Sequence, residues 1–323
     1  MTLEATRTAG PALADPLTED EIDDARRRIE GTAIVTPLVP TLDGRTHLKL
    51  ECLQPHGSYK IRGATNAVRA RIERDGRVDT IISASAGNFG QAVAAAAAAY
   101  GLKCIIHAPD VAARVKIDNL KHLGAEVREH AFARWWEIMQ TRKTGEDGVF
   151  IHPVAEREVI AGAATLGDEL ADDLPNAKTI YVPFGGGGLI CGVAQAVKAR
   201  NPECRIVAVE SEVSIPLKSA LAAGKPVEVE RGPSFIDGMG STTVLPQMWP
   251  LLQRLVDDVV VVSVAEVSEA VNRLLREHHV VAEGAGAAAL AAAAHDPGHS
   301  TIAIVSGGNI DWPVLEKIVA FQR

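Results

Sequence analysis

The sequence predicts an α/β protein of two lobes, each a mostly parallel sheet covered by helices. Three observations lead to this fold class. Apolar runs of strand length alternate with helical segments along most of the chain, an order typical of parallel sheets. Runs such as 302–305 are wholly apolar, as strands buried on both faces are. The chain has 323 residues, enough for two lobes with a sizeable core.

The first expected element is a helix that starts at Thr18. Thr18 and Glu21 match a capping box, in which each side chain bonds the other's backbone N–H, and Gly31 is placed to end the helix. The strands that follow are expected at 47–50, 80–83, 104–107, 179–183, 205–209 and 301–305. The later helices are expected at 88–100, 114–122, 189–199, 267–277 and 285–294, with a short last helix from Trp312. Polar residues at 141–148 indicate a surface loop.

Composition and charge narrow the possible functions. A hydrophobic fraction of 47% and a charged fraction of 23% are ordinary for a soluble globular protein. A net charge of −8 argues against nucleic acid or an anionic membrane as the main partner, and no apolar stretch reaches membrane-spanning length. The first residues lack the pattern of a secretory signal, and the four cysteines show no metal-ligand spacing. We therefore expect a cytoplasmic protein.

The most informative loop is a run of glycines between a buried strand and a helix. It consists of Gly185, Gly186, Gly187 and Gly188, followed by Leu189. Glycines let several N–H groups turn inward, and the dipole of the following helix attracts negative charge, so the segment predicts an anion site. Leu189 stands where a P-loop needs lysine, which disfavours a nucleoside triphosphate. A tight turn that needs small residues is the alternative.

A second turn follows the expected strand at 80–83 and opens an alanine-rich helix. Its residues are Ser85, Ala86, Gly87 and Asn88. The free N–H groups at a helix start can hold a carboxylate, such as that of an amino acid. Taken alone, the segment is better explained by Asn88 acting as an N-cap.

Two further residues complete the set. Ser306 follows the strand at 301–305, where a hydroxyl faces the crevice in which such sheets bind ligands, and Lys60 follows a glycine-containing turn. Taken alone, Ser306 is better explained as part of an ordinary turn, and Lys60 as a solvated side chain. Together the four segments supply an amine, an anion site, free N–H groups and a hydroxyl. These groups can hold a phosphorylated aldehyde as a Schiff base, and we therefore predict pyridoxal 5'-phosphate as the cofactor.

The same segments resemble the threonine/serine dehydratase family of pyridoxal-phosphate enzymes, called fold type II, which also includes serine racemase. The resemblance is carried by residues 50–64, 85–90, 185–189, 283–290 and 306–309. It implies a homodimer whose chain has two domains. The large cofactor-binding domain would comprise residues 1–53 and 153–323, and the small domain, which carries the substrate-carboxylate loop, residues 54–152.

The resemblance also implies roles for single residues. Lys60 would bind the cofactor covalently and serve as the catalytic residue. Asn88 would hydrogen-bond the ring hydroxyl of the cofactor, and Ser306 would face its pyridine nitrogen. The glycine run and the N–H of Leu189 would hold the phosphate, and the turn at 85–88 would hold the substrate carboxylate. Glu283 is expected near the ring, behind the residues that touch it.

These roles predict β-elimination from a β-hydroxy amino acid such as threonine or serine, which yields a 2-oxo acid and ammonia. An amino-acid racemase and a β-replacement enzyme of the same fold are the alternatives. Ala86 counts against the racemase, because a serine there would be the second acid/base group. No metal is expected: Glu210 matches one ligand of a cation site in some relatives, but Pro216 lacks the side-chain oxygen that another ligand position requires.

Overall fold

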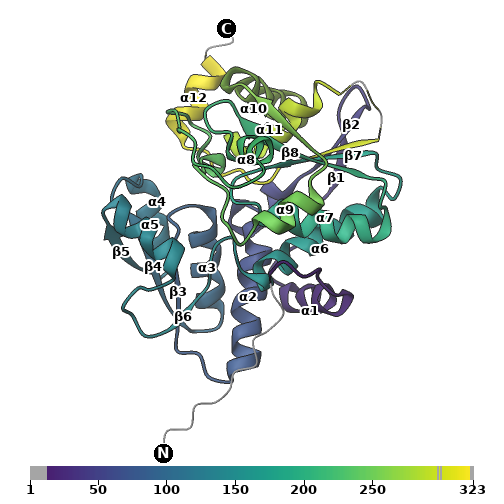
Figure 1. The fold of residues 1–323 in the computed structure, drawn as a ribbon. Coiled ribbons are helices and arrows are strands. Elements are labelled where there is room, and N and C mark those ends of the chain that lie inside the picture. The colour runs from purple at the N-terminus through teal and green to yellow at the C-terminus, as the bar shows by residue number, and fades with distance from the viewer. Residues whose placement is uncertain (1–12, 297, 299, 321–323) are drawn as a thin grey trace, which may run out of the picture.

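The structure is a computed structural model that describes residues 13–296, 298 and 300–320. Its strands form two sheets, one in the upper and one in the lower part of Figure 1. The larger sheet contains, in spatial order, β1 (Leu38–Pro40), β2 (Thr46–Lys49), β10 (Thr301–Ile304), β7 (Thr179–Pro183), β8 (Arg205–Ser211) and β9 (Asp258–Val262). The smaller sheet contains β5 (Glu126–His130), β4 (Lys103–Pro109), β3 (Thr80–Ser83) and β6 (Val149–Phe150).

The pairing of the strands confirms the predicted fold class. Within the described residues, β1 and β2 are antiparallel and every other neighbouring pair is parallel. Thr46 of β2 lies opposite Thr301 of β10, so the early and late parts of the chain share one sheet. All four strands of the smaller sheet fall between residues 54 and 152. The domain boundaries themselves stay a prediction.

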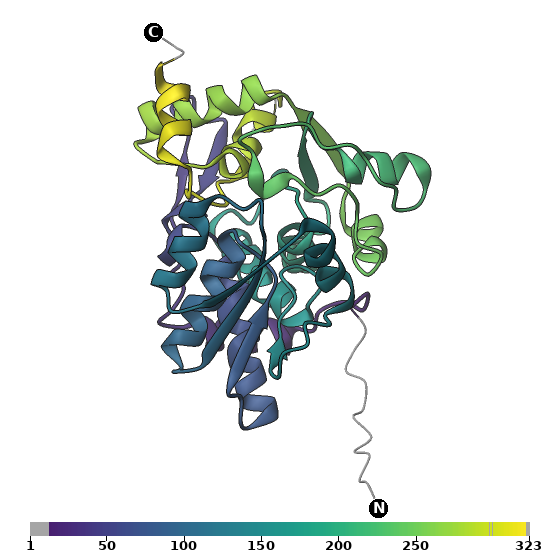
Figure 2. The ribbon, with the colours of Figure 1, turned by 90° about the vertical axis from the view of Figure 1, so that its left-hand side faces the viewer.

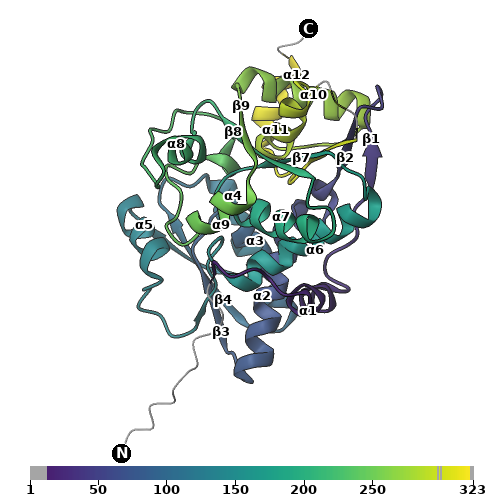
Figure 3. The ribbon, with the colours of Figure 1, turned by 45° about the vertical axis from the view of Figure 1, so that its right-hand side comes forward.

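Helices surround both sheets, and three views at different angles make their layers visible (Figures 1, 2 and 3). In the described residues they are α1 (Glu19–Ile29), α2 (Lys60–Asp75), α3 (Asn88–Ala99), α4 (Arg114–His122), α5 (Phe132–Thr141), α6 (Arg157–Asp173), α7 (Gly188–Arg200), α8 (Pro216–Ala223), α9 (Trp249–Leu255), α10 (Val264–His278), α11 (Gly284–Ala293) and α12 (Trp312–Ala320). Short 3-10 turns occur at Glu51–Leu53, Pro55–Gly57 and Asp237–Met239.

The larger sheet is buried on both faces. Ile302 and Ile304 of β10 pack into a cluster with α6, α7 and α9, whereas Ala303 and Val305 pack into a second cluster with α10, α11 and α12. Successive side chains of a strand point to opposite faces, which explains why this strand is apolar without interruption. The smaller sheet packs in the same way, against α2, α3 and α4 on one side and against α5 on the other.

Most predicted elements are confirmed. The strands at 80–83 and 179–183 and the helix at 114–122 have the expected bounds, and the other predicted elements differ by a few residues at their ends. Both hydrogen bonds of the Thr18–Glu21 capping box form, and Gly31 follows α1 with a φ of 75°. In the described part of the chain, no helix is long and apolar enough to cross a membrane.

The two longest helices, α2 and α6, were not predicted from the sequence. They cross where a Cβ on Gly162 would lie 2.5 Å from the Gly63 Cα, so only glycine permits their contact. α6 meets α7 in the same way, because a Cβ on Gly192 would lie 2.5 Å from the Ile160 carbonyl oxygen. Nine successive residues of α6, from Val159 to Gly167, are buried. A helix enclosed on all sides has no apolar stripe for periodicity to detect.

Candidate active site

One cavity collects residues that follow three parallel strands. Its lining consists of Tyr59, Lys60, Asn88, Val154, Pro183, Gly185, Gly186, Gly187, Gly188, Leu189, Gly238, Met239, Glu283, Ala285 and Ser306. Asn88 comes after β3, the glycine run after β7 and Ser306 after β10. All predicted cofactor-binding residues therefore border one space. Ser85, Ala86 and Gly87 do not line it, although they lead directly into Asn88.

Lys60 is the first residue of α2 and is held in place from the opposite loop. The Tyr59 N–H donates to the Ser306 carbonyl oxygen at 3.1 Å, and Ser58 forms a bridge with Gly307. The ammonium nitrogen of Lys60 lies 4.8 Å from the centre of the Tyr59 ring. Within the described residues it makes no hydrogen bond or ion pair. Backbone bonds thus fix the start of the helix while the amine is left available to a ligand.

The glycine run forms a cradle that side chains would fill. A Cβ on Gly185 would lie 2.5 Å from the Gly238 carbonyl oxygen, and one on Gly186 would lie 2.5 Å from Val154 Cγ2. Gly187 has a φ of 96° and caps α7, with no side chain bonded to the first turn. The N–H groups at the start of this 13-residue helix are therefore free to bind an anion.

Asn88 connects the two lobes and does not act as an N-cap. Gly87 occupies the N-cap position of α3, so the capping explanation of Asn88 is wrong. The Asn88 Nδ2 donates to Glu283 Oε1 at 2.7 Å, and its Oδ1 accepts from Asn309 Nδ2 at 2.8 Å. A carboxamide has two N–H donors and two acceptor lone pairs. Asn88 therefore keeps one donor and one acceptor position for a ligand.

Glu283 precedes α11 and lines the cavity beside Asn88. Burial raises the pKa of Glu283 to about 7, against the opposing effects of the Asn88 hydrogen bond and the positive charge of Lys116. A Cβ on Gly307 would lie 2.3 Å from Glu283 Oε1, so a larger residue there would displace this carboxyl group. The carboxyl group is thus packed tightly against the loop that follows β10.

The turn at 85–88 leaves the start of α3 without a side-chain cap. A Cβ on Gly90 would lie 1.9 Å from the Ser85 carbonyl oxygen, so the turn closes onto the helix only with glycine at that position. Free N–H groups at the start of this 12-residue helix can receive a carboxylate. Ser306 is 4% exposed, and its hydroxyl makes no hydrogen bond within the described residues.

Comparison with known proteins identifies the family. The model of a family described as pyridoxal-phosphate dependent enzyme matches residues 29–307. The chain belongs to this family. An L-threonine ammonia-lyase of Thermotoga maritima is 35% identical over 314 residues, which are 94% of this chain and 78% of that protein. The catabolic L-threonine dehydratase TdcB of Escherichia coli is 32% identical over 324 residues, which are 95% of this chain and 97% of that protein.

Solved structures agree with this assignment. Maize serine racemase has a TM-score of 0.84 at 31% identity, with 95% of this chain and 98% of that chain covered. A threonine deaminase from T.th. has a TM-score of 0.84 at 30% identity, with 92% of this chain and 99% of that chain covered. The predicted resemblance and the fold type II architecture are therefore confirmed.

Pyridoxal phosphate is accordingly the cofactor of this enzyme, and the cavity fits it. The glycine run cannot carry side chains without clashes and has free N–H groups of the kind that bind phosphate. The amine of Lys60 is unpaired within the described residues and borders the same cavity. Asn88 and Ser306 have hydrogen-bonding capacity left for the polar atoms of a ring. The glycine cradle thus suits the phosphate of a phosphorylated aldehyde, the Lys60 amine suits its aldehyde group, and Asn88 and Ser306 suit its ring.

Sequence reasoning missed several residues of the cavity wall. They are Val154, Pro183, Gly238, Met239 and Ala285. Val154 and Gly238 contact the glycine run through space, from segments with no recognisable motif. Pro183 and Ala285 lie within segments that the sequence did single out, the strand at 179–183 and the segment 283–290, but neither residue was assigned to the site.

Proposed function

We propose that this pyridoxal-phosphate enzyme converts a β-hydroxy amino acid such as threonine or serine into a 2-oxo acid and ammonia. The observation that carries the proposal is the unpaired Lys60 amine beside a glycine anion cradle, with a free helix start at 85–88 next to it. Relatives named threonine ammonia-lyase or dehydratase, at 32–35% identity, support the same reaction.

Each residue of the site has its own role in the proposed reaction. Bound pyridoxal phosphate supplies the aldehyde that takes up the substrate amine and the conjugated ring that draws electrons from the α-carbon. The glycine run and the Leu189 N–H would hold the phosphate, Asn88 would donate to the ring hydroxyl, and Ser306 would face the ring nitrogen. Lys60 would hold the cofactor between turnovers, and its Nζ, once freed by the substrate amine, would take the proton from the substrate α-carbon.

The turn at 85–88 orients the substrate through its carboxylate. N–H groups at the start of α3 point at the carboxylate, and the helix dipole favours its negative charge. Loss of the β-hydroxyl as water and hydrolysis of the resulting enamine then give the 2-oxo acid and ammonia. A serine hydroxyl at the ring nitrogen stabilises negative charge on the ring less than a carboxylate partner would, which favours prompt elimination over transamination.

An amino-acid racemase is the second candidate, supported by the similarity to maize serine racemase. Racemisation needs an acid/base group on each face of the α-carbon. Ala86 offers no such group in the turn at 85–88, so we propose elimination as the main reaction. β-Replacement would use the same residues and differs in the nucleophile that captures the product.

Lys60→Ala provides the central test. We expect no formation of 2-oxo acid or ammonia from L-threonine and L-serine, and no cofactor mass on the protein after borohydride reduction. The matched control is Lys121→Ala, because Lys121 is an exposed lysine of α4. This variant should keep both the formation of products and the cofactor mass. Undiminished ammonia release by Lys60→Ala refutes the proposal. Formation of the opposite enantiomer without 2-oxo acid by the unmodified enzyme favours the racemase.

We also propose that the enzyme acts as a homodimer in the cytoplasm and needs no metal. The four cysteines, Cys52, Cys104, Cys191 and Cys204, are free and buried, as suits a reducing compartment. Glu210 accepts hydrogen bonds from the Leu217 and Lys218 N–H groups, so the start of α8 already engages this carboxylate. Light scattering of the purified holoenzyme tests the dimer, and activity after chelation tests the metal proposal.

A further inference from the structure

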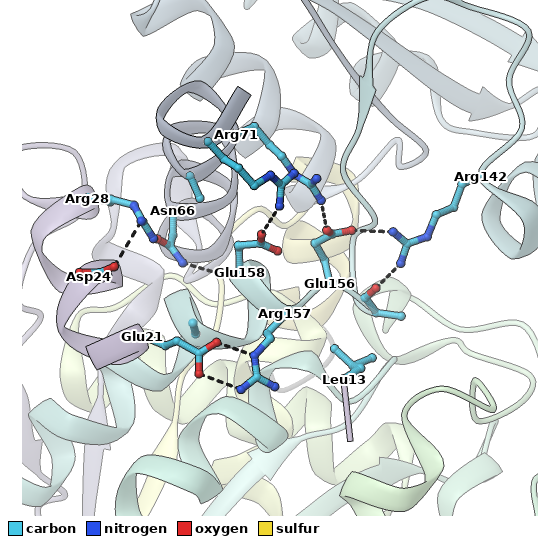
Figure 4. Close-up of a pocket in the computed structure, with 14 residues that line it drawn as sticks. Leu13, Glu21, Asp24, Arg28, Asn66, Arg71, Arg142, Glu156, Arg157 and Glu158 are labelled. Atoms are coloured by element: carbon cyan, nitrogen blue, oxygen red, sulfur yellow. Dashed lines mark hydrogen bonds and ion pairs between the residues drawn. The ribbon is translucent and has the colours of Figure 1, made fainter. Parts of the chain in front are cut away.

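A second cavity, of about 470 Å³, lies where α1, α2 and α6 meet (Figure 4). It shares no lining residue with the active site. Arg71 of α2 lines it and follows Lys60 by 11 positions, a rise of about 16 Å along the helix axis. The catalytic chemistry makes no use of this cavity.

Arginines dominate its wall. The five are Arg28, Arg71, Arg74, Arg142 and Arg157. Three of them have carboxylates of their own: Arg28 pairs with Asp24 and Glu73, Arg74 with Asp75 and Glu158, and Arg157 with Glu21. The remaining two, Arg71 and Arg142, share the single carboxylate of Glu156. Arg71, Arg142 and Glu156 together therefore carry one positive charge in excess, although the whole chain carries −8.

The geometry of the three residues is visible in Figure 4, where Arg71 and Arg142 come from different elements and both point to Glu156. Arg142 Nη1 donates to Glu156 Oε2 at 2.9 Å, and Arg71 Nη2 bonds Oε1. The Nε–H of Arg71 is buried and has no hydrogen-bond partner among the described residues. A buried donor on a charged group is costly to leave unsatisfied, so a small shift of the Arg71 side chain toward an acceptor atom in the cavity is favoured.

We propose that the cavity is a second ligand site, which binds a small molecule through an oxyanion, phosphate or carboxylate, held by Arg71 and Arg142. The forked guanidinium group matches both oxyanions through paired hydrogen bonds. The volume lies in the range of small-molecule sites. Glu21 and Glu158 on the same wall repel a polyanion and accept hydrogen bonds from hydroxyl or amine groups, so the ligand is a compact molecule with one anionic end and polar donors.

The segment 154–156 connects this site to the active site. Val154 lines the active-site cavity, whereas Ala155 and Glu156 line the second one. Arg142 also donates to the Ala155 carbonyl oxygen. Substitutions at 142, 155 or 156 therefore act on this segment directly, whereas Arg71 reaches it only through the Glu156 carboxylate.

Calorimetric titration of the holoenzyme with inorganic phosphate, and separately with succinate, tests the proposal. Occupied by its cofactor, the glycine cradle does not compete for phosphate. We expect saturable binding of at least one probe to the unmodified enzyme, and in Arg71→Gln a dissociation constant about tenfold higher or more, from the loss of charged hydrogen bonds. Arg77→Gln is the matched control, because Arg77 is 86% exposed and lies outside the cavity; it should bind like the unmodified enzyme.

The outcomes separate clearly. Phosphate binding that Arg71→Gln weakens identifies a phosphate site, and succinate binding weakened by the same change identifies a carboxylate site. Absence of saturable binding of both probes, or equal affinity in Arg71→Gln, overturns the proposal. If Arg71→Gln fails to fold, Arg71→Lys replaces it: lysine keeps a positive charge beside Glu156 but lacks the forked guanidinium group, so it should also weaken binding. Because heat of binding is measured, the result does not depend on the reaction proposed above.

Discussion

Asn88 and Glu283 lie 195 positions apart in the chain, yet Asn88 Nδ2 donates a hydrogen bond to Glu283 Oε1 at 2.7 Å. Asn88 opens α3 beside the smaller sheet, and Glu283 precedes α11 against the larger sheet. The Asn309 side chain extends the link, because its Nδ2 donates both to Asn88 Oδ1 and to the His56 carbonyl oxygen. The two lobes are therefore joined at the atoms that we propose contact the cofactor ring.

The buried carboxyl group of Glu283 should make stability depend on pH. Burial raises the pKa of Glu283 to about 7 from its ordinary value of 4.5, so the folded protein binds this proton more tightly than the unfolded chain. The stabilisation is present below pH 4.5 and is lost as the pH rises through 7. Glu283→Gln lacks this loss. In cofactor-free protein, the free energy of unfolding of Glu283→Gln relative to that of the unmodified chain should therefore rise by about 1 to 3 kcal/mol from pH 5 to pH 9.

Urea unfolding at the two pH values measures this difference. Glutamine can still accept the Asn88 hydrogen bond, so the two proteins should be similar at pH 5. Glu269→Gln serves as the control, since Glu269 lies outside the active-site cavity. A pH dependence that is unchanged in Glu283→Gln would show that the carboxyl group titrates alike in both states.

The motifs of the site were predictable because each is local. A glycine run, a turn or a serine directly after an apolar strand can be recognised from a few residues, and the carboxyl ends of parallel strands meet at one edge. The hydrogen bond from Asn88 to Glu283 was not predictable, because the two residues lie 195 positions apart and the local sequence around Asn88 favours capping. The place of Val154 in the cavity wall and the close contact of Gly63 with Gly162 both depend on how distant segments pack together. Such packing leaves no pattern in either segment alone.

The glycines of the cradle should differ in their tolerance of alanine. In Gly185→Ala the new Cβ would lie 2.5 Å from the Gly238 carbonyl oxygen, whereas in Gly188→Ala nothing lies closer than 3.7 Å. Relieving the first clash requires backbone movement, so Gly185→Ala should lose about 1 to 3 kcal/mol of stability and bind pyridoxal phosphate about tenfold or more weakly. Gly188→Ala is the control and should lose little stability and little affinity for the cofactor. Cofactor titration followed by absorbance gives the affinities.

Gly186→Ala permits a rescue that Gly185→Ala does not. Its Cβ would lie 2.5 Å from Val154 Cγ2, a side-chain atom. Val154→Ala in the same protein removes that atom, so the double variant should bind the cofactor more tightly than Gly186→Ala alone. Adding Val154→Ala to Gly185→Ala should bring no improvement, because the clash there is with backbone. Equal affinities with and without Val154→Ala contradict the packing that the structure shows.

His152 should make the enzyme sensitive to acid. Burial and the positive charge of Arg142 lower the pKa of His152 to about 3 from 6.5. Its Nδ1 accepts hydrogen bonds from the N–H groups of Val154 at 3.0 Å and Ala155 at 2.8 Å. The ring hydrogen is therefore on Nε2, which donates to the Met139 carbonyl oxygen at a distance of 3.1 Å. The neutral ring thus holds the segment that borders both cavities.

Protonation of His152 removes that acceptor and favours the unfolded chain. The unfolded state binds the proton near pH 6.5 and the folded state only near 3, so the stabilisation is present above pH 6.5 and falls as the pH is lowered. At pH 5 the loss relative to pH 7 should be about 2 kcal/mol from this residue. Burial also lowers the pKa of His107, to about 4, so His152→Gln should reduce the acid loss without abolishing it. Urea unfolding at pH 5 and pH 7 measures the loss, with His122→Gln, at an exposed position of α4, as the control. Equal acid loss in His152→Gln and His122→Gln would mean that the buried ring does not govern the response.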